Sequence, residues 1–363
     1  MNEQFVPALS GRNVLVTGHT GFKGSWLAAW LHRLGAHVTG YSLPPPTVPN
    51  HFAAAGVGEL LARDVRGDIR DGDLMARVVA DAEPDVIFHL AAQPIVRAGF
   101  SNPRETFDVN VLGTASLLDA VRGTGKPCVV VVVTSDKCYR NDGQVWGFRE
   151  IDPLGGHDPY SASKAGTELV VDAYRSSFFT PAEAGVRLAS GRAGNVIGGG
   201  DWAGDRLVPD AVRALSEGSE LIVRNPLSTR PWQHVLEPLS GYLALAARML
   251  HEPAEPRWCS AFNFGPVSSE EATVADLATA LVGAWGSGSW RPLANQPKSD
   301  GEAGTLRIAI DKAVSDLGWR PRWQLAETVR RTADWYRSYY DDPEGSMRAK
   351  TLADIEAYET AGA

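Results

Sequence analysis

Cysteine is scarce in this chain, which has only Cys128, Cys138 and Cys259 among 363 residues. The three are widely spaced, odd in number and form no CxxC pair, so neither a disulfide framework nor a zinc site is indicated. Free thiols of this kind are typical of a reducing compartment. We therefore expect a protein without structural disulfides and without a bound metal.

Long hydrophobic runs and an excess of positive charge are also missing. No apolar stretch approaches the ~20 residues of a membrane span, and Met1–Gly11 shows no basic segment followed by an apolar one. The formal net charge of −8 argues against a surface that neutralises nucleic-acid phosphates. We expect a cytoplasmic protein that binds a small molecule, with neither a membrane nor a nucleic acid as partner.

The first half of the chain alternates short β-branched runs with helix-like stretches. Its overall composition, 44% hydrophobic and 21% charged, is that of a folded protein. Alternation of this kind predicts an α/β fold of the Rossmann type, a doubly wound parallel sheet. The wholly apolar run Val129–Val133 indicates a central strand that is covered on both faces. The predicted strands are Asn13–Thr17, His37–Tyr41, Asp64–Arg66, Val86–Leu90, Val129–Thr134 and Val186–Arg192.

After Asn195 the sequence changes to Gly, Pro, Trp and Arg in loops, interrupted by helical patterns. Because 363 residues exceed the usual size of one core, we expect a smaller, discontinuous C-terminal lobe that binds the substrate. We assign residues 1–197 to the cofactor-binding domain, with 232–266 contributed from later in the chain, and 198–231 and 267–363 to the lobe. The helices predicted in this half are Pro238–Leu250, Thr273–Trp285 and Leu325–Tyr340.

Three glycines follow the first predicted strand and open a helix in Gly18-His-Thr-Gly-Phe-Lys-Gly24. In a dinucleotide-binding turn the first glycine allows the tight turn, the second lets backbone amides approach the pyrophosphate, and the third lets the helix pack on the sheet. The helix N-terminus then faces the negative charge. A glycine-rich turn without a ligand is the alternative. The predicted cofactor contacts here are Gly18, Thr20, Gly21, Phe22, Lys23 and Gly24.

Two further strand ends are expected to meet the cofactor. Asp68 and Ile69 follow the third strand, where a carboxylate can accept the exocyclic amine of adenine, although a solvated loop Asp is the alternative. The small residues of Leu90-Ala91-Ala92 suit a backbone that passes close to the cofactor, and a plain strand end explains them almost as well. The second strand ends in Tyr41-Ser-Leu-Pro44 without an acidic or basic residue, so charge there does not choose between NAD and NADP.

Tyr160 and Lys164 stand four residues apart in a predicted helix and therefore share one face. A free Tyr has a pKa of about 10, and a neighbouring ammonium favours its phenolate. Tyr160 would then take a proton from an alcohol, while Lys164 would also hold the nicotinamide ribose. A Tyr/Lys pair at this spacing is common on protein surfaces. Downstream of a dinucleotide turn it indicates hydride-transfer chemistry.

A second group, Ser135-Asp136-Lys137, ends the apolar strand at the sheet edge where such folds bind ligands. Ser135 is placed to hydrogen-bond the substrate hydroxyl or the ketone that it becomes. Asp136 and Lys137 offer an acid and a base side by side, which plain hydride transfer does not require. A loop ion pair is the alternative interpretation.

Together these motifs resemble the CDP-glucose 4,6-dehydratases, members of the extended short-chain dehydrogenase/reductase family. The likeness extends over nearly the whole chain. In the related dTDP-glucose enzymes the residue that corresponds to Lys137 is typically Glu, so Lys137 points to the CDP branch. The motifs are Thr17-Gly-His-Thr-Gly-Phe-Lys-Gly24, His89-Leu-Ala-Ala-Gln-Pro94, Ser135-Asp-Lys137, Tyr160-x-x-x-Lys164, Arg192-Ala-Gly-Asn-Val-Ile-Gly-Gly-Gly-Asp-Trp202, Arg224-Asn-Pro226, Arg230-Pro-Trp-Gln-His-Val235 and Leu317-Gly-Trp-Arg-Pro-Arg-Trp323.

The resemblance implies NAD as cofactor and a mechanism of three steps. Tyr160 removes the C4 hydroxyl proton as hydride leaves C4, Lys137 removes the C5 proton while Asp136 protonates the departing C6 hydroxyl, and the hydride returns to C6. The product is a 4-keto-6-deoxy sugar. Another nucleotide-sugar 4,6-dehydratase, on a dTDP- or GDP-hexose, and a nucleotide-sugar 4-epimerase are the alternatives.

The resemblance also implies a nucleotide-sugar site and a homodimer or homotetramer. Arginine forks match phosphate oxygens, so arginines are candidates for the diphosphate, although each can equally form a structural or surface ion pair. Asn195, Trp202 and His234 fall in matching segments and can equally serve lobe packing. The predicted substrate contacts are Gln93, Arg192, Asn195, Arg224, Arg230 and His234.

Overall fold

The computed structural model describes residues 2–179, 185–267, 272–294 and 306–362. Within them, a central sheet of seven strands runs in the order β11-β6-β5-β4-β1-β2-β3. Every neighbouring pair is parallel, which confirms the predicted fold class. The strands are β1 (Asn13–Thr17), β2 (His37–Ser42), β3 (Arg63–Arg66), β4 (Val86–His89), β5 (Cys128–Val133), β6 (Val186–Ala193) and β11 (Ala261–Phe264).

The direction of winding reverses between β1 and β4. The chain moves outward from β1 through β2 to β3, returns to β4 on the other side of β1, and continues through β5 and β6. At such a switch point, the loops after adjacent strands diverge and leave a crevice for a ligand. The glycine turn after β1 and the segment Leu90–Ala92 after β4 lie on either side of it.

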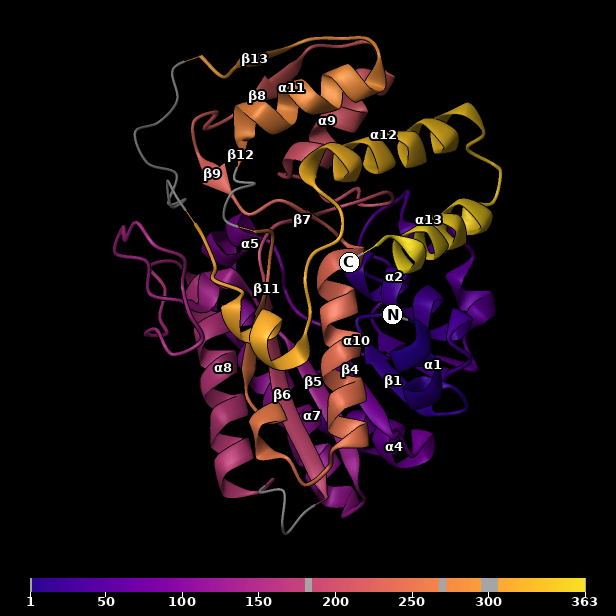
Figure 1. Ribbon diagram of the computed structural model, residues 1–363, viewed down its shortest axis with the longest axis vertical. Helices are drawn as coiled ribbons and strands as arrows, with labels where there is room; N and C mark the ends of the chain where they lie inside the picture. Colours follow the sequence, from indigo (N-terminus) through magenta and orange to yellow (C-terminus); the bar gives the residue numbers. More distant parts are fainter. Residues whose placement is uncertain (1, 180–184, 268–271, 295–305, 363) are drawn as a thin grey trace.

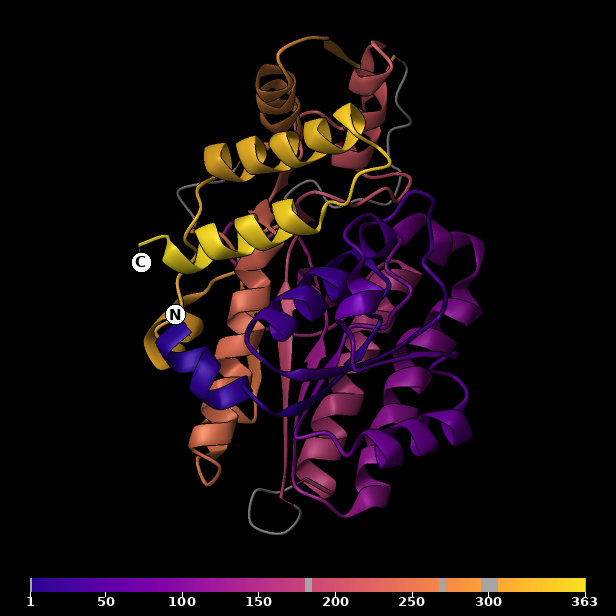
Figure 2. The same ribbon diagram turned by 90° about the vertical axis from the view of Figure 1, so that its right-hand side faces the viewer.

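Helices cover both faces of the sheet, as the edge-on view in Figure 2 shows. Along β5, Val129, Val131 and Val133 face one hydrophobic cluster, whereas Val130 and Val132 face the other. This explains why the strand has no polar alternation. The first face is packed by α1 (Asn2–Leu9), α2 (Phe22–Arg33) and α10 (Leu236–His251), and the second by α4 (Gly72–Ala82), α7 (Gly113–Thr124) and α8 (Pro159–Ser177).

A smaller group of elements lies beyond one end of the sheet, at the top of Figure 1. Three two-stranded pairings and three helices form it. The pairings are β7 (Val196–Ile197) with β10 (Gln233–His234), β8 (Leu221–Val223) with β13 (Trp290–Pro292), and β9 (Thr229–Arg230) with β12 (Ala272–Thr273), and the helices are α9 (Leu207–Ser216), α11 (Val274–Trp285) and α12 (Leu325–Asp341).

The remaining elements are short connections, apart from α13 at the carboxyl end, which contacts α2 and α12. They are α3 (His51–Ala54), η1 (Val57–Leu60), α5 (Val96–Ser101), α6 (Pro103–Phe107), η2 (Asp108–Leu112), η3 (Asp136–Cys138), η4 (Pro256–Trp258), η6 (Ala313–Leu317) and α13 (Arg348–Thr360).

The predicted elements match the observed ones to within two residues. Thr273, predicted as the first residue of a helix, instead caps α11: its hydroxyl accepts from the backbone N–H of Asp276, whose carboxylate accepts from the N–H of Thr273. Several elements were not predicted, and β11 and α13 are two of them. The strand β11, Ala-Phe-Asn-Phe, is too short to show a pattern, although it falls within the 232–266 segment that we expected to join the sheet, and α13 was also missed.

Candidate active site

A cavity of about 800 Å³ lies between the carboxyl ends of the strands and the small lobe. Nineteen of the predicted site residues line it, and Gln93, Arg192 and His234 do not. The lining residues are Gly18, Thr20, Gly21, Phe22, Lys23, Gly24, Asp68, Ile69, Leu90, Ala91, Ala92, Ser135, Asp136, Lys137, Tyr160, Lys164, Asn195, Arg224 and Arg230.

The glycine turn leaves no room for side chains at two of its three glycines. Gly18 has φ +76°, and a Cβ there would lie 2.6 Å from the backbone nitrogen of Ala91. A Cβ on Gly24 would lie 2.1 Å from the carbonyl oxygen of Gly18. Gly21 is the N-cap of α2 and has no side chain to cap the helix, so the first N–H groups of α2 remain available to an anion. This cradle fits a dinucleotide pyrophosphate.

Lys23 adds a cation to the same cradle. Burial lowers the pKa of Lys23 to about 7, helped by the positive charges of Arg206 and Lys164 and opposed by Asp136. A bound anion would raise this pKa again and fix the positive charge. The lysine is therefore suited to a ligand that brings phosphate charge into the cavity.

At the adenosine end, the turn is tied to the end of β2. Thr20 Oγ1 donates to the carbonyl of Leu43 at 2.9 Å and lies 2.9 Å from Ser42 Oγ. Asp68 lines the cavity, but its carboxylate accepts from Nε and Nη2 of Arg70, which lowers the pKa of Asp68. An adenine amine would thus meet an ionised carboxylate that already has one partner.

Tyr160 and Lys164 lie one turn apart at the start of α8, whose N-cap Asp158 accepts from the N–H of Ser161. Burial raises the pKa of Tyr160 to about 12, although its hydrogen bond with Ser135 acts in the opposite direction. Burial lowers the pKa of Lys164 to about 8, opposed chiefly by Glu168. We had expected the lysine to lower the tyrosine pKa. Instead, desolvation dominates both groups in the ligand-free protein.

Ser135, Asp136 and Lys137 follow β5 into the cavity, where η3 turns them toward α8. Ser135 Oγ donates to Oδ1 of Asp136 at 2.9 Å. The other oxygen, Oδ2, is buried and has no hydrogen-bond partner among the described residues. Burial raises the pKa of Asp136, against the effects of Lys137, Ser135, Arg230 and Lys23. A buried carboxyl with an unused oxygen and a raised pKa is suited to proton donation.

Positive side chains line the lobe side of the cavity. Arg230 is buried there, and Arg224 pairs with Asp205 at 3.1 Å. Arg206, which we did not predict, also lines the cavity and pairs with Asp201 at 2.9 Å. Burial lowers the pKa of Arg206, but Asp201 outweighs it and the net shift is upward. In the sequence, the one local indication that Arg206 is held in place is Asp201, an opposite charge five residues earlier in a loop that contains glycine.

Arg192 and His234 do not line the cavity, and the structure gives both of them internal partners. Arg192 Nη2 pairs with Glu168 at 2.8 Å, and Nη1 donates to Tyr139 Oη at 2.9 Å. His234 is buried, and its ring centroid lies 4.8 Å from that of Trp323. Burial lowers the pKa of His234 to about 3, so this histidine is neutral. This environment is compatible with lobe packing, the alternative considered from sequence, and a substrate contact of His234 stays a prediction.

Gln93 likewise uses its side chain within the protein. Its Nε2 donates to Thr106 Oγ1 at 2.9 Å, and its Oε1 accepts from the N–H of Ile95 at 2.5 Å. These bonds shape the loop after β4, next to the cavity residues Ala92 and Pro94.

A family model described as GDP-mannose 4,6 dehydratase matches residues 15–332. The chain belongs to this family. The match spans both the cofactor turn and most of the small lobe, so family membership covers the whole cavity.

Two curated relatives of this 4,6-dehydratase family member carry more specific names. The CDP-glucose 4,6-dehydratase of Salmonella typhimurium is 48% identical over 333 residues, which cover 91% of each chain. The dTDP-glucose 4,6-dehydratase of Streptomyces antibioticus is 32% identical over 337 residues, which cover 90% of this chain and 92% of that protein.

Among solved structures, the dTDP-glucose 4,6-dehydratase DesIV of Streptomyces venezuelae, with NAD bound, superimposes with a TM-score of 0.76 at 27% identity. The superposition covers 91% of this chain and 99% of that one. The fold of the family member is therefore that of an enzyme crystallised with NAD.

In the part of the 4,6-dehydratase chain that the structure describes, no helix is both long and apolar enough to cross a membrane. The same residues include no group of three or more His, Cys, Asp or Glu placed to hold a metal ion.

Proposed function

We propose that the protein is an NAD-dependent hydro-lyase that converts CDP-glucose to CDP-4-dehydro-6-deoxyglucose. The observation that carries the proposal is Oδ2 of Asp136, which is buried beside Lys137 and has no partner among the described residues, in the same cavity as Tyr160 and Lys164. A 4-epimerase has no use for an acid/base pair in addition to the Tyr/Lys pair. The 48% identity to a CDP-glucose 4,6-dehydratase supports the choice of nucleotide.

NAD would be held by the glycine turn, by the N-terminus of α2 and by Lys164. Reversible hydride acceptance is the chemistry that the bound cofactor supplies. On the protein side, residues at the ends of β5 and β6 and residues of the lobe line the cavity that would hold the cofactor and the sugar. Lys164 is placed one turn from Tyr160 on α8, so one side chain can bind a ribose hydroxyl while the other reaches the sugar.

Tyr160 takes the proton from the C4 hydroxyl. With its pKa near 12 in the ligand-free protein, it must be assisted, and the Lys164 ammonium and the Ser135 hydroxyl both favour the phenolate. Ser135 then lies next to the carbonyl oxygen that forms at C4. The 4-ketone acidifies the C5 hydrogen, which prepares the elimination.

Asp136 and Lys137 carry out that elimination. Lys137 removes the C5 proton, and Asp136 gives its proton to the C6 hydroxyl, which leaves as water, so one proton is taken and one is given. The raised pKa of Asp136 keeps this carboxyl protonated at a higher pH than a free Asp. After hydride returns to C6, a proton delivered to C5 completes the product.

The diphosphate is assigned to Arg206, Arg224 and Arg230, which line the lobe side of the cavity. Arg230 is the most buried of the three, so its attraction for phosphate is the least screened by water. Asn195, which also lines the cavity, supplies an amide near the same ligand.

A direct experiment supplies CDP-, dTDP-, UDP- and GDP-hexoses in parallel to the purified protein with NAD and identifies the products by mass spectrometry and NMR. The proposal predicts loss of water from CDP-glucose at a kcat/KM at least tenfold above the others. Faster dehydration of a different nucleotide sugar would overturn the CDP assignment. Conversion of CDP-glucose to its 4-epimer without loss of mass would overturn the dehydratase assignment.

We also propose that the protein is a homodimer or homotetramer through the outer face of α8. Exposed apolar side chains on adjoining elements support this, namely Phe107, Leu112 and Leu169, beside a groove lined by glycine, alanine and leucine residues of 154–169. Light scattering should give a mass of two or four chains for the wild type and of one chain for Leu112→Glu/Leu169→Glu. A monomeric wild type would overturn the proposal.

The cytoplasm is the proposed location, because all three cysteines are buried and free. We keep the division of the chain into a cofactor domain, 1–197 with 232–266, and a lobe of 198–231 and 267–363. The pairing of β11 with β6 supports the first part. The helix α13 contacts α2, so it also packs against the proposed cofactor domain.

A further inference from the structure

One buried carboxylate joins the two halves of the candidate active site. Glu168 lies on α8 one turn beyond Lys164, and its side chain is 3% exposed. Its Oε1 accepts from Thr134 Oγ1. Its Oε2 accepts from Ser190 Oγ and from Arg192 Nη2, each at 2.8 Å. The helix with the Tyr/Lys pair is thereby bonded to the ends of both β5 and β6.

The hydrogen bond from Thr134 is the one that connects Glu168 to the proposed catalytic residues. Thr134 follows the last residue of β5 and directly precedes Ser135, so its position sets where Ser135 and Asp136 enter the cavity. Tyr160 lies two helical turns before Glu168 on the same helix. The effect of Ser135 on the pKa of Tyr160 therefore depends on how the end of β5 is held against α8, and Glu168 makes that connection.

The negative charge of Glu168 also acts on Lys164. It is the largest influence that raises the pKa of Lys164, against desolvation. The other titratable groups that act on Lys164 are Cys138 of η3, Lys23 of α2 and His89 of β4. His89 is neutral because burial lowers its pKa to about 3. Lys23 is a like charge, so Glu168 is the one carboxylate among these four groups.

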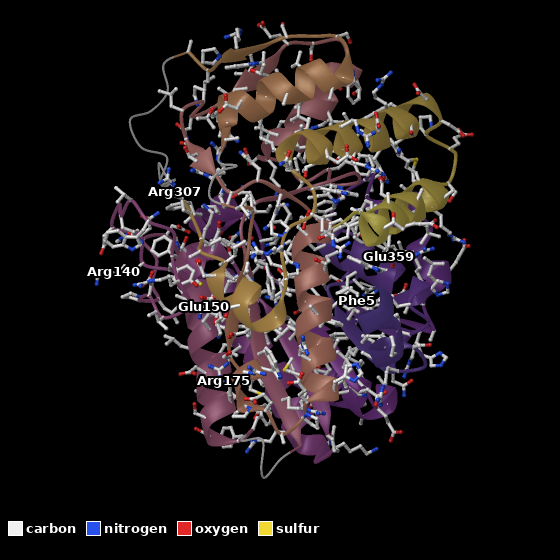
Figure 3. All side chains as sticks on the ribbon, in the orientation of Figure 1. Phe5, Arg140, Glu150, Arg175, Arg307 and Glu359 are labelled. Atoms are coloured by element: carbon white, nitrogen blue, oxygen red, sulfur yellow. The ribbon has the colours of Figure 1, made fainter. Side chains whose placement is uncertain are left out.

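Arg192 compensates the buried charge of Glu168 and is itself held from the opposite side. It donates to Tyr139 Oη and to the carbonyl of Glu150, and Tyr139 Oη donates to Asn263 Oδ1 at 2.7 Å. Figure 3 labels Glu150, whose carboxylate accepts from the N–H of Asn263 on the edge strand β11. The Glu168–Arg192 pair is thus held by other side chains and backbone groups in the described part of the chain. It is not open to a ligand in the cavity.

We propose that Glu168 is a positioning residue for the oxidation step, holding the end of β5 so that Ser135 meets Tyr160 and keeping the Lys164 side chain charged. This role rests on the proposed function for its kinetic consequence. The effect of Glu168 on the pKa of Lys164 does not depend on the proposed function, and it is measured in the protein without cofactor or substrate.

The first experiment compares Thr134→Val with Ser190→Ala. Each removes one hydroxyl bond to Glu168 and keeps the Glu168–Arg192 pair, but only Thr134 leads into Ser135. Single-turnover formation of reduced cofactor should slow at least tenfold in Thr134→Val and less than threefold in Ser190→Ala, with little change in substrate KM. Equal slowing of the two variants, in step with their melting temperatures, would mean that the carboxylate is only a structural contact.

The second experiment measures the pKa of Lys164 by NMR of protein with 13C-labelled lysine, without cofactor or substrate. Lys164→Arg identifies the resonance. In Glu168→Gln the pKa of Lys164 should fall by at least one unit, and Glu168→Asp, which keeps the charge, should restore most of it. An unchanged Lys164 pKa in Glu168→Gln would overturn the electrostatic role. This readout is independent of the nucleotide sugar that the enzyme converts.

Discussion

Ser135 donates its hydroxyl hydrogen bond to Oδ1 of Asp136, and Oδ2 of the same carboxyl is left buried without a partner in the described structure. Burying a polar atom in this way has a free-energy cost of about 1–3 kcal/mol. Gly194 lies opposite, where a Cβ would approach Oδ2 to 3.0 Å, so the space beside this oxygen depends on a residue without a side chain. The arrangement keeps one carboxyl oxygen free for a ligand hydroxyl.

Asp136→Asn should block elimination while leaving oxidation at C4 intact. An amide keeps the size of the carboxyl but has no proton to give to the C6 hydroxyl, so product formation should fall about 100-fold or more. Reduced cofactor should accumulate on the enzyme, visible by its absorbance. In the wild type, burial raises the pKa of Asp136, so the rate of elimination should decline as pH rises through that pKa. This decline in the pH profile should be absent in the variant. An unchanged pH profile would contradict the acid role.

Lys137→Ala should also stop the reaction after oxidation, because the C5 proton then has no acceptor. Reduced cofactor should form at close to the wild-type rate and persist, and exchange of the C5 hydrogen with deuterated solvent should be lost. The second readout separates this variant from Asp136→Asn, which retains the base. Normal release of the 6-deoxy product by Lys137→Ala would show that the base lies elsewhere.

Arg206→Ala should weaken substrate binding more than turnover. Its guanidinium lines the cavity and is held by Asp201, so its loss removes one charged hydrogen bond of about 1.5–3 kcal/mol, which corresponds to a rise in KM of about 10- to 150-fold. Arg63→Ala is the matched control, since Arg63 pairs with Asp81 at the surface. If kcat falls and KM does not change, Arg206 acts on the chemical step instead.

Glu237 should make stability depend on pH. Burial raises its pKa from 4.5 to about 7, opposed by hydrogen bonds from Tyr358 and from the N–H groups of Trp323 and Arg322. Between these two pH values the folded chain binds a proton that the unfolded chain does not. The contribution of Glu237 to stability is therefore greatest at the acid end and falls as pH rises to about 7, on the order of 3 kcal/mol in total.

Urea unfolding of the wild type and Glu237→Gln at a series of pH values measures this effect. The difference in unfolding free energy should move in favour of the Gln variant from pH 5 to pH 8. Glu59→Gln, at an exposed carboxylate paired with Arg348, should show no such trend. A difference for Glu237→Gln that stays constant with pH would contradict the raised pKa.

Local spacing was enough to predict the cofactor turn and the Tyr160/Lys164 pair, because both depend on backbone geometry within one turn. The sheet was predictable because buried parallel strands leave uniform apolar runs such as Val129–Val133. Arg192 shows the limit of such reasoning. An arginine at a strand end has the same sequence context whether it faces a phosphate or a buried carboxylate, and its partner Glu168 lies on a different element.

Arg206 and Glu168 were missed for related reasons. Glu168 stands four residues after Lys164, a spacing that puts it on the same helix face. Its importance, however, comes from Ser190 and Arg192 on β6 and from Thr134 just after β5. Arg206 lies in an irregular loop whose path is set by tertiary contacts, among them the bond from Tyr336 Oη to the carbonyl of Asp201. Long-range partners of this kind leave no local periodicity to detect.

In the proposed reaction, hydride leaves C4 and returns to C6 of the same sugar while water is lost. CDP-glucose carrying deuterium at C4 tests it most directly, with the product analysed by NMR and mass spectrometry. The deuterium should appear at C6 of a product that has lost water. Deuterium that remains at C4, in a product of unchanged mass, would contradict it.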